Sequence, residues 1–308
     1  MTALQLQPET TFCGVPFSTL DELDADVAIV GAPHGTPYKP GTPSHAANGA
    51  DAVRRALSWY STGTEQMDFD SIQPVFAGAS VVDLGNVTAD LQNGDINRAN
   101  IEAATRAVLE RNCVPILLGG DDSVPIPFIQ ALGHRHEKLT VVQVDAHIDW
   151  RDQVGGVTHG FSSTMRRASE MAHVKNIVQI GARGPGSARR KDYDDALTWG
   201  AWIFTARDVH RKGLEEALDA VPEGADVVLC IDVDGIDPSV VPGVILPAFG
   251  GLHYQQMLDI IHGVAERARI VAVDFVEFVP EEDLHARGAQ AIARLACNVI
   301  NMVAGVHT

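Results

Sequence analysis

Asp145, His147 and Asp149 lie two residues apart where an apolar run ends, in the segment 141–149 that reads VVQVDAHID. In extended backbone, side chains two residues apart point to the same side. Two carboxylates and an imidazole would therefore converge just past a buried strand. Carboxylate oxygens and imidazole nitrogens together are ligands for a divalent transition metal. The alternative is that the acids cap backbone amides and that His147 is an ordinary loop residue.

Two further apolar runs also end in acids. Residues 227–234 read VVLCIDVD and finish in Asp232 and Asp234, and residues 114–118 lead into GGDDS, which contains Asp122. Ligands of open parallel sheets bind outside the carboxyl ends of the strands. We therefore expect the three runs to deliver their acids to one site, because separate capping roles would need the same arrangement to arise independently in each run.

The elements that must position these acids follow an alternating pattern. Short apolar runs alternate with segments of helical periodicity, which predicts parallel strands joined by helical crossovers, with helices on both faces of the sheet. No linker, repeat or low-complexity tract interrupts the pattern, so we expect one domain over residues 1–308, with an irregular arm at 1–24. The expected strands are 27–30, 79–84, 114–118, 141–144, 177–180, 202–205, 227–231 and 270–275, and the expected helices are 95–112, 161–172, 214–220, 254–268 and a last one around 292–303.

Residues 31–44 form a long segment rich in glycine and proline, which predicts a loop. Loops of this length in compact domains are usually functional or disordered. His34 and His45 lie in or beside it, and neither has a partner at metal-ligand spacing. A pocket-lining or structural role is therefore expected for both, rather than metal binding.

Composition excludes several classes of function. The chain of 308 residues carries 40 acidic and 23 basic side chains, a formal charge of −17. Such a surface repels nucleic acid and anionic membranes and is compatible with a cationic substrate. Cys113 and Cys230 lie beside or within apolar runs and form no C-x-x-C pair, so reduced core thiols are expected. With no spanning apolar stretch and no signal-peptide pattern at the start, a cytoplasmic enzyme is expected.

The motifs resemble those of the ureohydrolases, the family of arginase, agmatinase and guanidinobutyrase. The resemblance covers most of the chain in the right order. DAHID together with DVDGIDP is highly specific, whereas GGDDS alone is weak. The matching segments are GAPHGTPYKPG (31–41), GGDDS (119–123), DAHID (145–149), HG (159–160), DVDGIDPSVVPG (232–243) and DFVEFVP (274–280).

The resemblance implies a three-layer α/β/α fold with a mostly parallel, eight-stranded sheet. It implies two divalent metal ions, usually Mn²⁺ and sometimes Ni²⁺, and a bridging hydroxide that attacks a guanidinium carbon and releases urea. The implied substrate is a small cationic guanidino compound. Trimers or hexamers are implied as the assembly, with a homologous subunit as a further partner in some members.

The resemblance also implies roles for single residues. Asp145 and Asp232 would bridge the two ions, His147 and Asp234 would complete the shell of one ion, and Asp149 would belong to the other. The family's further ligand on that second ion is the histidine of GGDHS. Here that position is Asp122, which makes five acids face two divalent ions. The surplus negative charge should raise the pKa of a bound water and attract a cationic substrate.

Three residues are implied in catalysis. Asp149 would hold the attacking hydroxide by a hydrogen bond, Glu277 would bind the guanidinium, since planar guanidinium pairs well with carboxylate, and His159 would give a proton to the leaving amine. Trp150 follows Asp149, where the family often carries a smaller residue. It could narrow the pocket and restrict the substrate to a short or apolar tail; the alternative is that the indole turns into the core.

Two alternatives remain open at this point. The chain could be a non-catalytic or metal-depleted partner of an active ureohydrolase subunit, because Asp122 alters the ligand set. It could also be a deacetylase-like amidohydrolase, which shares the fold. Those enzymes need one zinc ion and lack acids at positions like Asp149 and Asp234, and both acids are present here.

Overall fold

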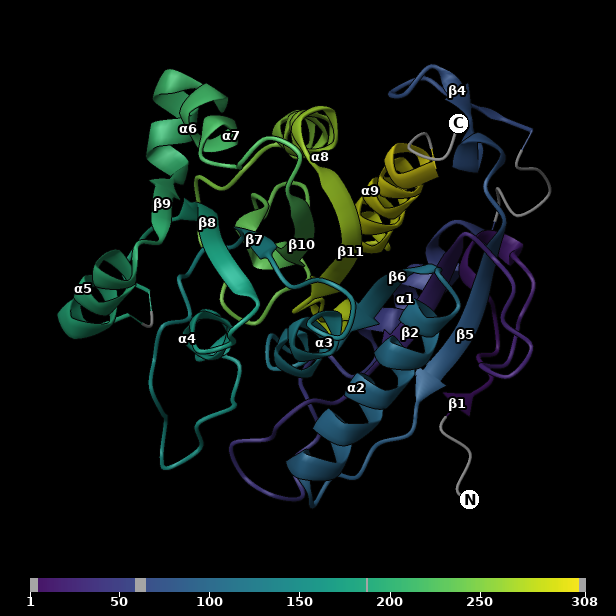
Figure 1. Ribbon diagram of the computed structural model, residues 1–308, viewed down its shortest axis with the longest axis horizontal. Coiled ribbons are helices and arrows are strands. Elements are labelled where there is room, and N and C mark those ends of the chain that lie inside the picture. Colours follow the sequence, from purple (N-terminus) through teal and green to yellow (C-terminus); the bar gives the residue numbers. More distant parts are fainter. Residues whose placement is uncertain (1–4, 59–64, 187, 305–308) are drawn as a thin grey trace.

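A nine-stranded sheet runs through the centre of the computed structural model, which describes residues 5–58, 65–186 and 188–304 (Figure 1). The strand order is β1-β5-β2-β6-β11-β10-β7-β8-β9. Only the β1–β5 pair is antiparallel among the described strands of this sheet, so the predicted eight-stranded parallel sheet is confirmed. The strands are β1 (Gln5–Leu6), β2 (Val27–Ala32), β5 (Val81–Val87), β6 (Val114–Gly119), β7 (Leu139–Val144), β8 (Val174–Ala182), β9 (Trp202–Thr205), β10 (Asp226–Asp232) and β11 (Arg269–Val276), and a separate hairpin joins β3 (Met67–Asp68) to β4 (Gln73–Pro74).

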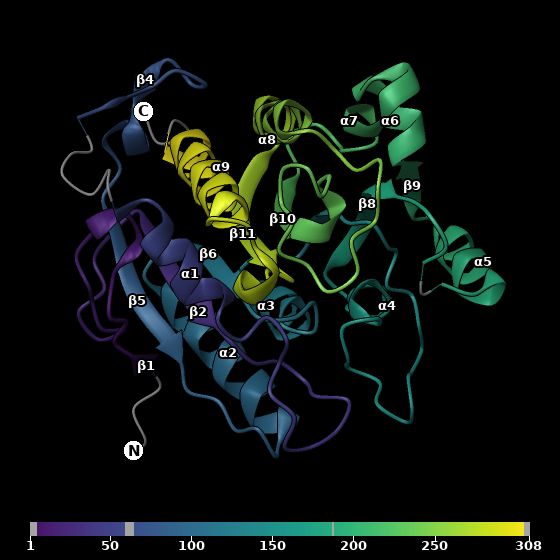
Figure 2. The same cartoon turned by 180° about the vertical axis from the view of Figure 1, so that it is seen from behind.

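Helices cover both faces of the sheet, which gives the expected three layers (Figures 1 and 2). One core cluster lies under α1, α6, α7, α8 and α9, and the other lies under α2, α3, α4 and α5. Because both faces are buried, the inner strands are apolar almost throughout. The helices are α1 (Gly49–Ala56), α2 (Gly94–Glu110), α3 (Pro125–Leu132), α4 (Thr164–Ser169), α5 (Arg190–Trp199), α6 (Ala206–Lys212), α7 (Glu215–Asp219), α8 (Tyr254–Arg267) and α9 (Arg287–Ala304).

The structure corrects three expectations about the elements. The arm at 1–24 is not wholly irregular, because it supplies β1 at the edge of the sheet and a 3-10 turn at Phe12–Gly14. The helix expected at 161–172 begins only at Thr164, since a turn precedes it in which the Ser163 amide donates to the Gly160 carbonyl at 2.9 Å. Helices α1, α3, α5 and α6 were not predicted. All four cysteines are free thiols, which includes Cys113 and Cys230, for which this was expected.

A fully buried ion pair fastens α1 to the sheet. The Arg54 guanidinium donates to both carboxylate oxygens of Asp83, at 2.9 and 3.0 Å, and to the Gly85 carbonyl at 3.1 Å. Both charged side chains have no exposed surface. Removing one partner of such a pair leaves an uncompensated buried charge, which is strongly destabilising.

The strands that end in acids are neighbours. In the sheet order, β6, β11, β10 and β7 are adjacent and parallel. Their carboxyl ends therefore meet at one edge, near the centre of the sheet. β6 and β7, which are consecutive along the chain, flank β10 and β11 at this edge. The topology thus places every chain turn that carries a candidate ligand beside the others.

Candidate metal centre

Each of the four central strands delivers a carboxylate at its carboxyl end. Asp232 is the last residue of β10, and Asp145 directly follows β7. Asp122 lies in the turn after β6, and Glu277 directly follows β11. Asp234 stands in the short 3-10 turn Val233–Gly235 after β10. The convergence that the spacing predicted is therefore present.

Two groups of ligand atoms come together, and they share one residue. Asp145, His147 and Asp234 offer atoms that all lie within 4.8 Å of one another, and Asp122, Asp145 and Asp232 do the same. The Nδ1 atom of His147 lies 3.3 Å from Asp145 Oδ1 and 3.2 Å from Asp234 Oδ2. A shared carboxylate between two three-ligand groups is the arrangement that two neighbouring cations require.

Backbone amides hold the carboxylates in place. The His147 amide donates to Asp145 Oδ1 at 2.6 Å, the Ala146 amide donates to Asp234 Oδ1 at 3.1 Å, and the Asp234 amide donates to Asp232 Oδ1 at 2.8 Å. These bonds satisfy part of each carboxylate and leave its remaining lone pairs for another partner. The local turns thus orient the acids before any ion binds.

Gln143 links Asp149, the third candidate ligand in the segment after β7, to this cluster. Its side-chain amide donates to Asp145 Oδ2 at 2.7 Å and to Asp149 Oδ2 at 3.4 Å. Asp149 has a backbone φ of 46°, in the left-handed region. Such a conformation costs a non-glycine residue about 1–3 kcal/mol and is retained mostly at functional sites. Asp149 is thereby turned toward Asp145.

The electrostatics of the site call for cations. Asp122, Asp145, Asp149, Asp232 and Asp234 are each at most 7% exposed. Burial raises the pKa of Asp122 well above its ordinary value, and the charges of Asp149 and Asp145 raise it further. Burial and the charge of Asp145 likewise raise the pKa of Asp149. A raised pKa means that, without cations, burial and neighbouring charges favour the protonated forms of Asp122 and Asp149.

The donor set fits divalent ions on two further observations. Oδ2 of Asp122 is buried and has no hydrogen-bond partner within the described part of the chain. In a site with several carboxylates, a buried oxygen without a hydrogen-bond partner is better explained by a bound cation than by an empty apolar space. Burial opposes a charge on His147, yet its hydrogen bonds to Asp145 and Asp234 raise its pKa to about 12. A cation would take the place of that proton.

Glu277 lies at the edge of the cluster and is held from several sides. It is 6% exposed, and its backbone φ of 66° is also left-handed. Its amide donates to the Gly120 carbonyl at 2.8 Å, and its Oε1 accepts the Asp122 amide at 2.8 Å. Its Oε2 is in close contact with Nε2 of His45. His45 therefore belongs to the site, although the sequence predicted only a pocket-lining or structural role for it.

His159 lies in a different setting. Its Nδ1 is 2.9 Å from the Thr158 hydroxyl. Burial lowers its pKa, and the charges of Arg98 and Arg167 lower it further. The charged residues that shift the pKa of His159 most strongly are not candidate metal ligands. The role of His159 as a proton donor stays a prediction.

The expectation that Trp150 narrows the pocket is wrong. Trp150 is 1% exposed, and its indole nitrogen donates to Gln179 Oε1 at 2.8 Å. Its ring packs against Trp199 with centroids 6.1 Å apart. The buried amide offers the indole nitrogen a partner that it needs away from water, so the side chain turns into the core. Trp150 sets no limit on the tail of a substrate.

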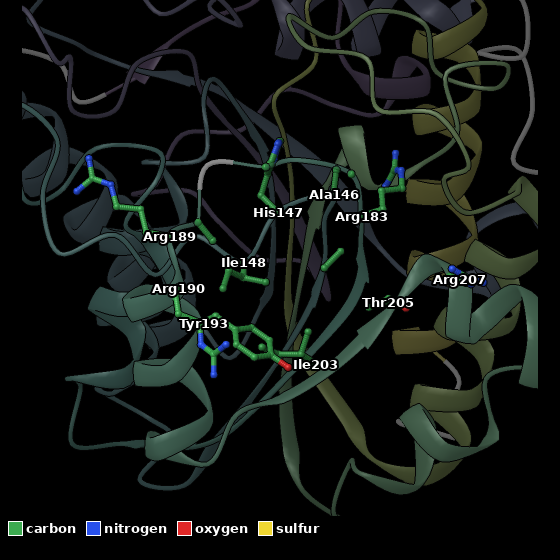
Figure 3. A pocket seen from close by; sticks show the side chains of 14 residues that line it. Ala146, His147, Ile148, Arg183, Arg189, Arg190, Tyr193, Ile203, Thr205 and Arg207 are labelled. Atoms are coloured by element: carbon green, nitrogen blue, oxygen red, sulfur yellow. The ribbon is translucent and has the colours of Figure 1, made fainter.

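A cavity of about 550 Å³ borders the metal-ligand candidate His147, which lies on the opposite side of it from Tyr193 (Figure 3). The guanidinium of Arg183 is bound to backbone carbonyls, with Nη2 donating to Asp234 at 2.6 Å and to Ala248 at 2.8 Å. Arg183 therefore braces the turn that carries Asp234. The cavity also shows that this side of His147 is not closed by packing.

Comparison with known proteins finds relatives over most of the chain. A model described as the arginase family matches residues 25–302. The guanidinobutyrase of Pseudomonas aeruginosa is 31% identical over 92% of this chain and 89% of its own, and the mitochondrial agmatinase of Gallus gallus is 30% identical over 92% and 82%. The solved proclavaminate amidino hydrolase of Streptomyces clavuligerus has a TM-score of 0.84 at 24% identity and covers 99% of both chains. Among the described residues no helix has the length and apolarity needed to cross a membrane.

Proposed function

The chain belongs to the arginase family, and from this premise we propose that it hydrolyses a carbon–nitrogen bond of a guanidino compound. The products would be urea, or a urea derivative, and an amine. The observation that carries the proposal is the pair of buried ligand groups that share Asp145. This arrangement supports two divalent ions beside Glu277, a carboxylate suited to a planar guanidinium.

The ligands would divide between the two ions in a simple way. Asp145 and Asp232 would contact both, His147 and Asp234 would complete one shell, and Asp122 with Asp149 would complete the other. Two divalent ions in such a site would lower the pKa of a water, so that a hydroxide nucleophile is available near neutral pH. The protein's part is to fix these ligands, as the amide contacts to Asp145, Asp232 and Asp234 do.

Three side chains would act on the substrate. Glu277 would bind the guanidinium at the edge of the ligand cluster. Asp149 would hold the attacking oxygen by a hydrogen bond. His159, whose ring lies beside Thr158, would pass a proton to the leaving amine.

The names of the relatives bracket the substrate. Curated relatives include a guanidinobutyrase, an agmatinase and an N(1)-aminopropylagmatine ureohydrolase. We propose a small cationic guanidino compound for this chain, either agmatine-like or a smaller guanidine, alkylguanidine or biguanide. The acidic surface, with a formal charge of −17, supports attraction of a cation.

Urea release tests the proposal. The purified chain would be loaded with Mn²⁺ or Ni²⁺ and given agmatine, arginine, 4-guanidinobutyrate, guanidine and alkylated guanidines. We expect metal-dependent urea from at least one compound, and none from the same protein after chelation. A chain that holds two ions per subunit and releases no urea from any of these compounds would refute the proposal.

Two arguments from ligand chemistry favour different metals. An oxygen-rich set that includes Asp122 favours a hard ion such as Mn²⁺, whereas the general affinity order favours Ni²⁺. We propose Mn²⁺ as the usual ion of the family, with Ni²⁺ as the alternative. Elemental analysis of the chain purified without added metal, together with activity after each reconstitution, distinguishes them.

A second candidate function rests on Asp122. If its carboxylate did not hold an ion, the chain would be a silent partner of an active subunit. The grouping of Asp122 with Asp145 and Asp232 within 4.8 Å supports the active alternative. Activity of the chain expressed alone decides between the two.

We further propose a trimer or hexamer in the cytoplasm. Large apolar side chains are exposed on the described surface, with Phe249 at 84%, Leu246 at 67% and Trp202 at 53%. Such groups supply apolar area for contacts between subunits. The mass in solution, measured by light scattering on a sizing column, tests the assembly.

A further inference from the structure

The carboxylate of Glu277 is fixed at both oxygens by donors from two distant parts of the chain. Oε1 accepts the Asp122 amide at 2.8 Å, from the turn after β6. Oε2 contacts Nε2 of His45, which lies 232 residues away in the loop between β2 and α1. The terminal torsion of a glutamate is broad and has weak intrinsic preferences. One donor therefore fixes one oxygen, and only the second donor sets the plane of the carboxylate.

The ring of His45 is itself held in place. It packs edge-on against Phe161, with ring centroids 5.4 Å apart and planes at 87°. Phe161 in turn packs on Tyr38, with centroids 4.6 Å apart, and the Tyr38 hydroxyl accepts the Ser162 amide at 3.0 Å. The His45 side chain is 23% exposed. The contact with Glu277 is thus part of a packed wall, in contrast to a surface pair that solvent can separate.

Neighbouring charges agree with this geometry. Burial alone would lower the pKa of His45, but its hydrogen bond to Glu277 and the charge of Glu277 outweigh burial and raise it. Burial raises the pKa of Glu277, and His45 offsets part of that effect. An ionised carboxylate can only accept, so the contact with Glu277 fits the imidazole form that carries a proton on Nε2.

We propose that His45 is a positioning residue that sets the plane of the Glu277 carboxylate for a substrate guanidinium. The lone pairs of both oxygens lie in the plane of the carboxylate, and the Asp122 amide and His45 together fix how that plane is turned. A planar guanidinium pairs with a carboxylate through two parallel hydrogen bonds and is sensitive to that plane. The inference rests on the proposed function and gives the loop between β2 and α1 a part in substrate binding that acts through Glu277.

The test compares His45→Ala and His45→Gln in the metal-loaded full chain. If the carboxylate is turned so that it loses one of its two hydrogen bonds to the guanidinium, substrate binding weakens about tenfold to a hundredfold. We expect His45→Ala to raise KM by about that factor, with metal content unchanged and a smaller change in kcat. Glutamine places an N–H near the position of Nε2, so His45→Gln should restore most of the loss. His262→Ala is the matched control, because His262 Nε2 pairs with Asn298 Oδ1 at 2.9 Å between α8 and α9.

A double variant separates positioning from general damage. If His45 acts through Glu277, His45→Ala combined with Glu277→Gln should bind no more weakly than Glu277→Gln alone. Additive losses, or a KM for His45→Ala equal to that of His262→Ala, would overturn the inference. A purely structural role would lower thermal stability and leave the KM ratio unchanged.

Calorimetric binding of guanidinium ion distinguishes this inference from the proposed function. If the wild-type chain binds guanidinium but releases no urea, the hydrolase proposal fails and the ratio of Kd values still decides the role of His45. A tenfold weaker Kd in His45→Ala than in His262→Ala would support it, and equal values would refute it. If the wild-type chain binds no guanidinium yet releases urea from a larger guanidino compound, the hydrolase proposal stands and the KM ratio for that compound decides the role of His45.

Discussion

Asp274 is a buried acid directly beneath the ligand cluster, and replacing it should stabilise the chain. It lies in β11, three residues before Glu277, and its register partner in β10 is Cys230. It has no exposed surface, and neither carboxylate oxygen accepts a well-formed hydrogen bond from the described residues. Burial raises the pKa of Asp274 to about 7, although Cys230 and the Ile231 amide lower it slightly. The ionised form is therefore disfavoured in the folded state.

The magnitude follows from linkage between proton binding and folding. The step from an ordinary pKa of 3.8 to about 7 in the folded chain, at about 1.4 kcal/mol per pH unit, makes the charge cost roughly 4 kcal/mol above about pH 7. Because the folded pKa is raised, the folded state binds more protons between these values, and stability falls as pH rises from about 4 to about 7. At about pH 5 the cost is roughly 2 kcal/mol.

Asp274→Asn removes this pH dependence. A buried amide without partners costs about 1–3 kcal/mol at every pH, so the variant should be more stable than wild type by roughly 1–3 kcal/mol at about pH 8. Between about pH 8 and about pH 5 this advantage in unfolding free energy should shrink by roughly 2–3 kcal/mol, because the cost of the amide is the same at both pH values and only the cost of the Asp274 charge changes.

Urea unfolding of both metal-loaded proteins at the two pH values is the assay. Asp237→Asn is the control. Burial tends to raise the pKa of Asp237, but hydrogen bonds from Ser239, Gly251 and Gly250 outweigh it and lower the pKa. Its stabilising contribution is thus present throughout this pH range and is lost only in stronger acid. A constant difference between Asp274→Asn and wild type at both pH values would refute the reasoning.

Three further variants test the site and its frame. Asp232→Asn halves the charge-bearing oxygens between the two ions, so we expect activity and bound metal to be lost; full occupancy with normal turnover in elemental and kinetic assays would contradict the ligand assignment. Asp122→His should tighten metal retention and keep or raise urea release, or create activity if the chain is silent, whereas no change in either would show that position 122 does not touch an ion. Arg54→Met leaves the charge of Asp83 buried without its cation, and should cost about 3–5 kcal/mol of unfolding free energy. Asp83→Asn in the same chain removes that charge and keeps an acceptor for one of the two amides that Asp83 binds, those of Phe12 and Gly85, so it should restore part of the loss; an equally unstable double variant would argue against the pair.

Several features of the fold could be predicted from the sequence because they depend on periodicity. Buried parallel strands read as short apolar runs, and the eight predicted runs all lie in the central sheet. Some of the helices were missed because they lack that signal. α3, for example, carries two prolines among its eight residues, Pro125 and Pro127, and is buried on most sides, so neither polar spacing nor a clear helix start marks it. β1 has only two residues, and its pairing with β5 is set by tertiary contacts.

The site divides along a similar line. Acids at the carboxyl ends of neighbouring parallel strands could be predicted to converge from the topology alone. Their orientation could not, because Asp149 and Asp234 lie in turns beyond the strands, where alternation no longer applies. His45 gives no such signal, since its partner Glu277 lies at the far end of the chain. The direction of the Trp150 side chain is decided by a buried hydrogen-bond acceptor, Gln179, which lies on β8. Local spacing carries no information about such pairs, whereas the packed structure makes them plain.

Asp122 shows how main-chain and side-chain roles can be separated at one position. Its amide donates to Glu277 Oε1, and its carbonyl accepts the Thr164 hydroxyl. These contacts fix the turn whatever the side chain is, so the carboxylate, with one oxygen left unpartnered, is free to serve the ion. An aspartate there makes the shell of that ion richer in oxygen and adds a negative charge beside the guanidinium site. The same backbone could present an imidazole without moving Glu277, which is why a change in metal retention on Asp122→His would report on the ligand alone.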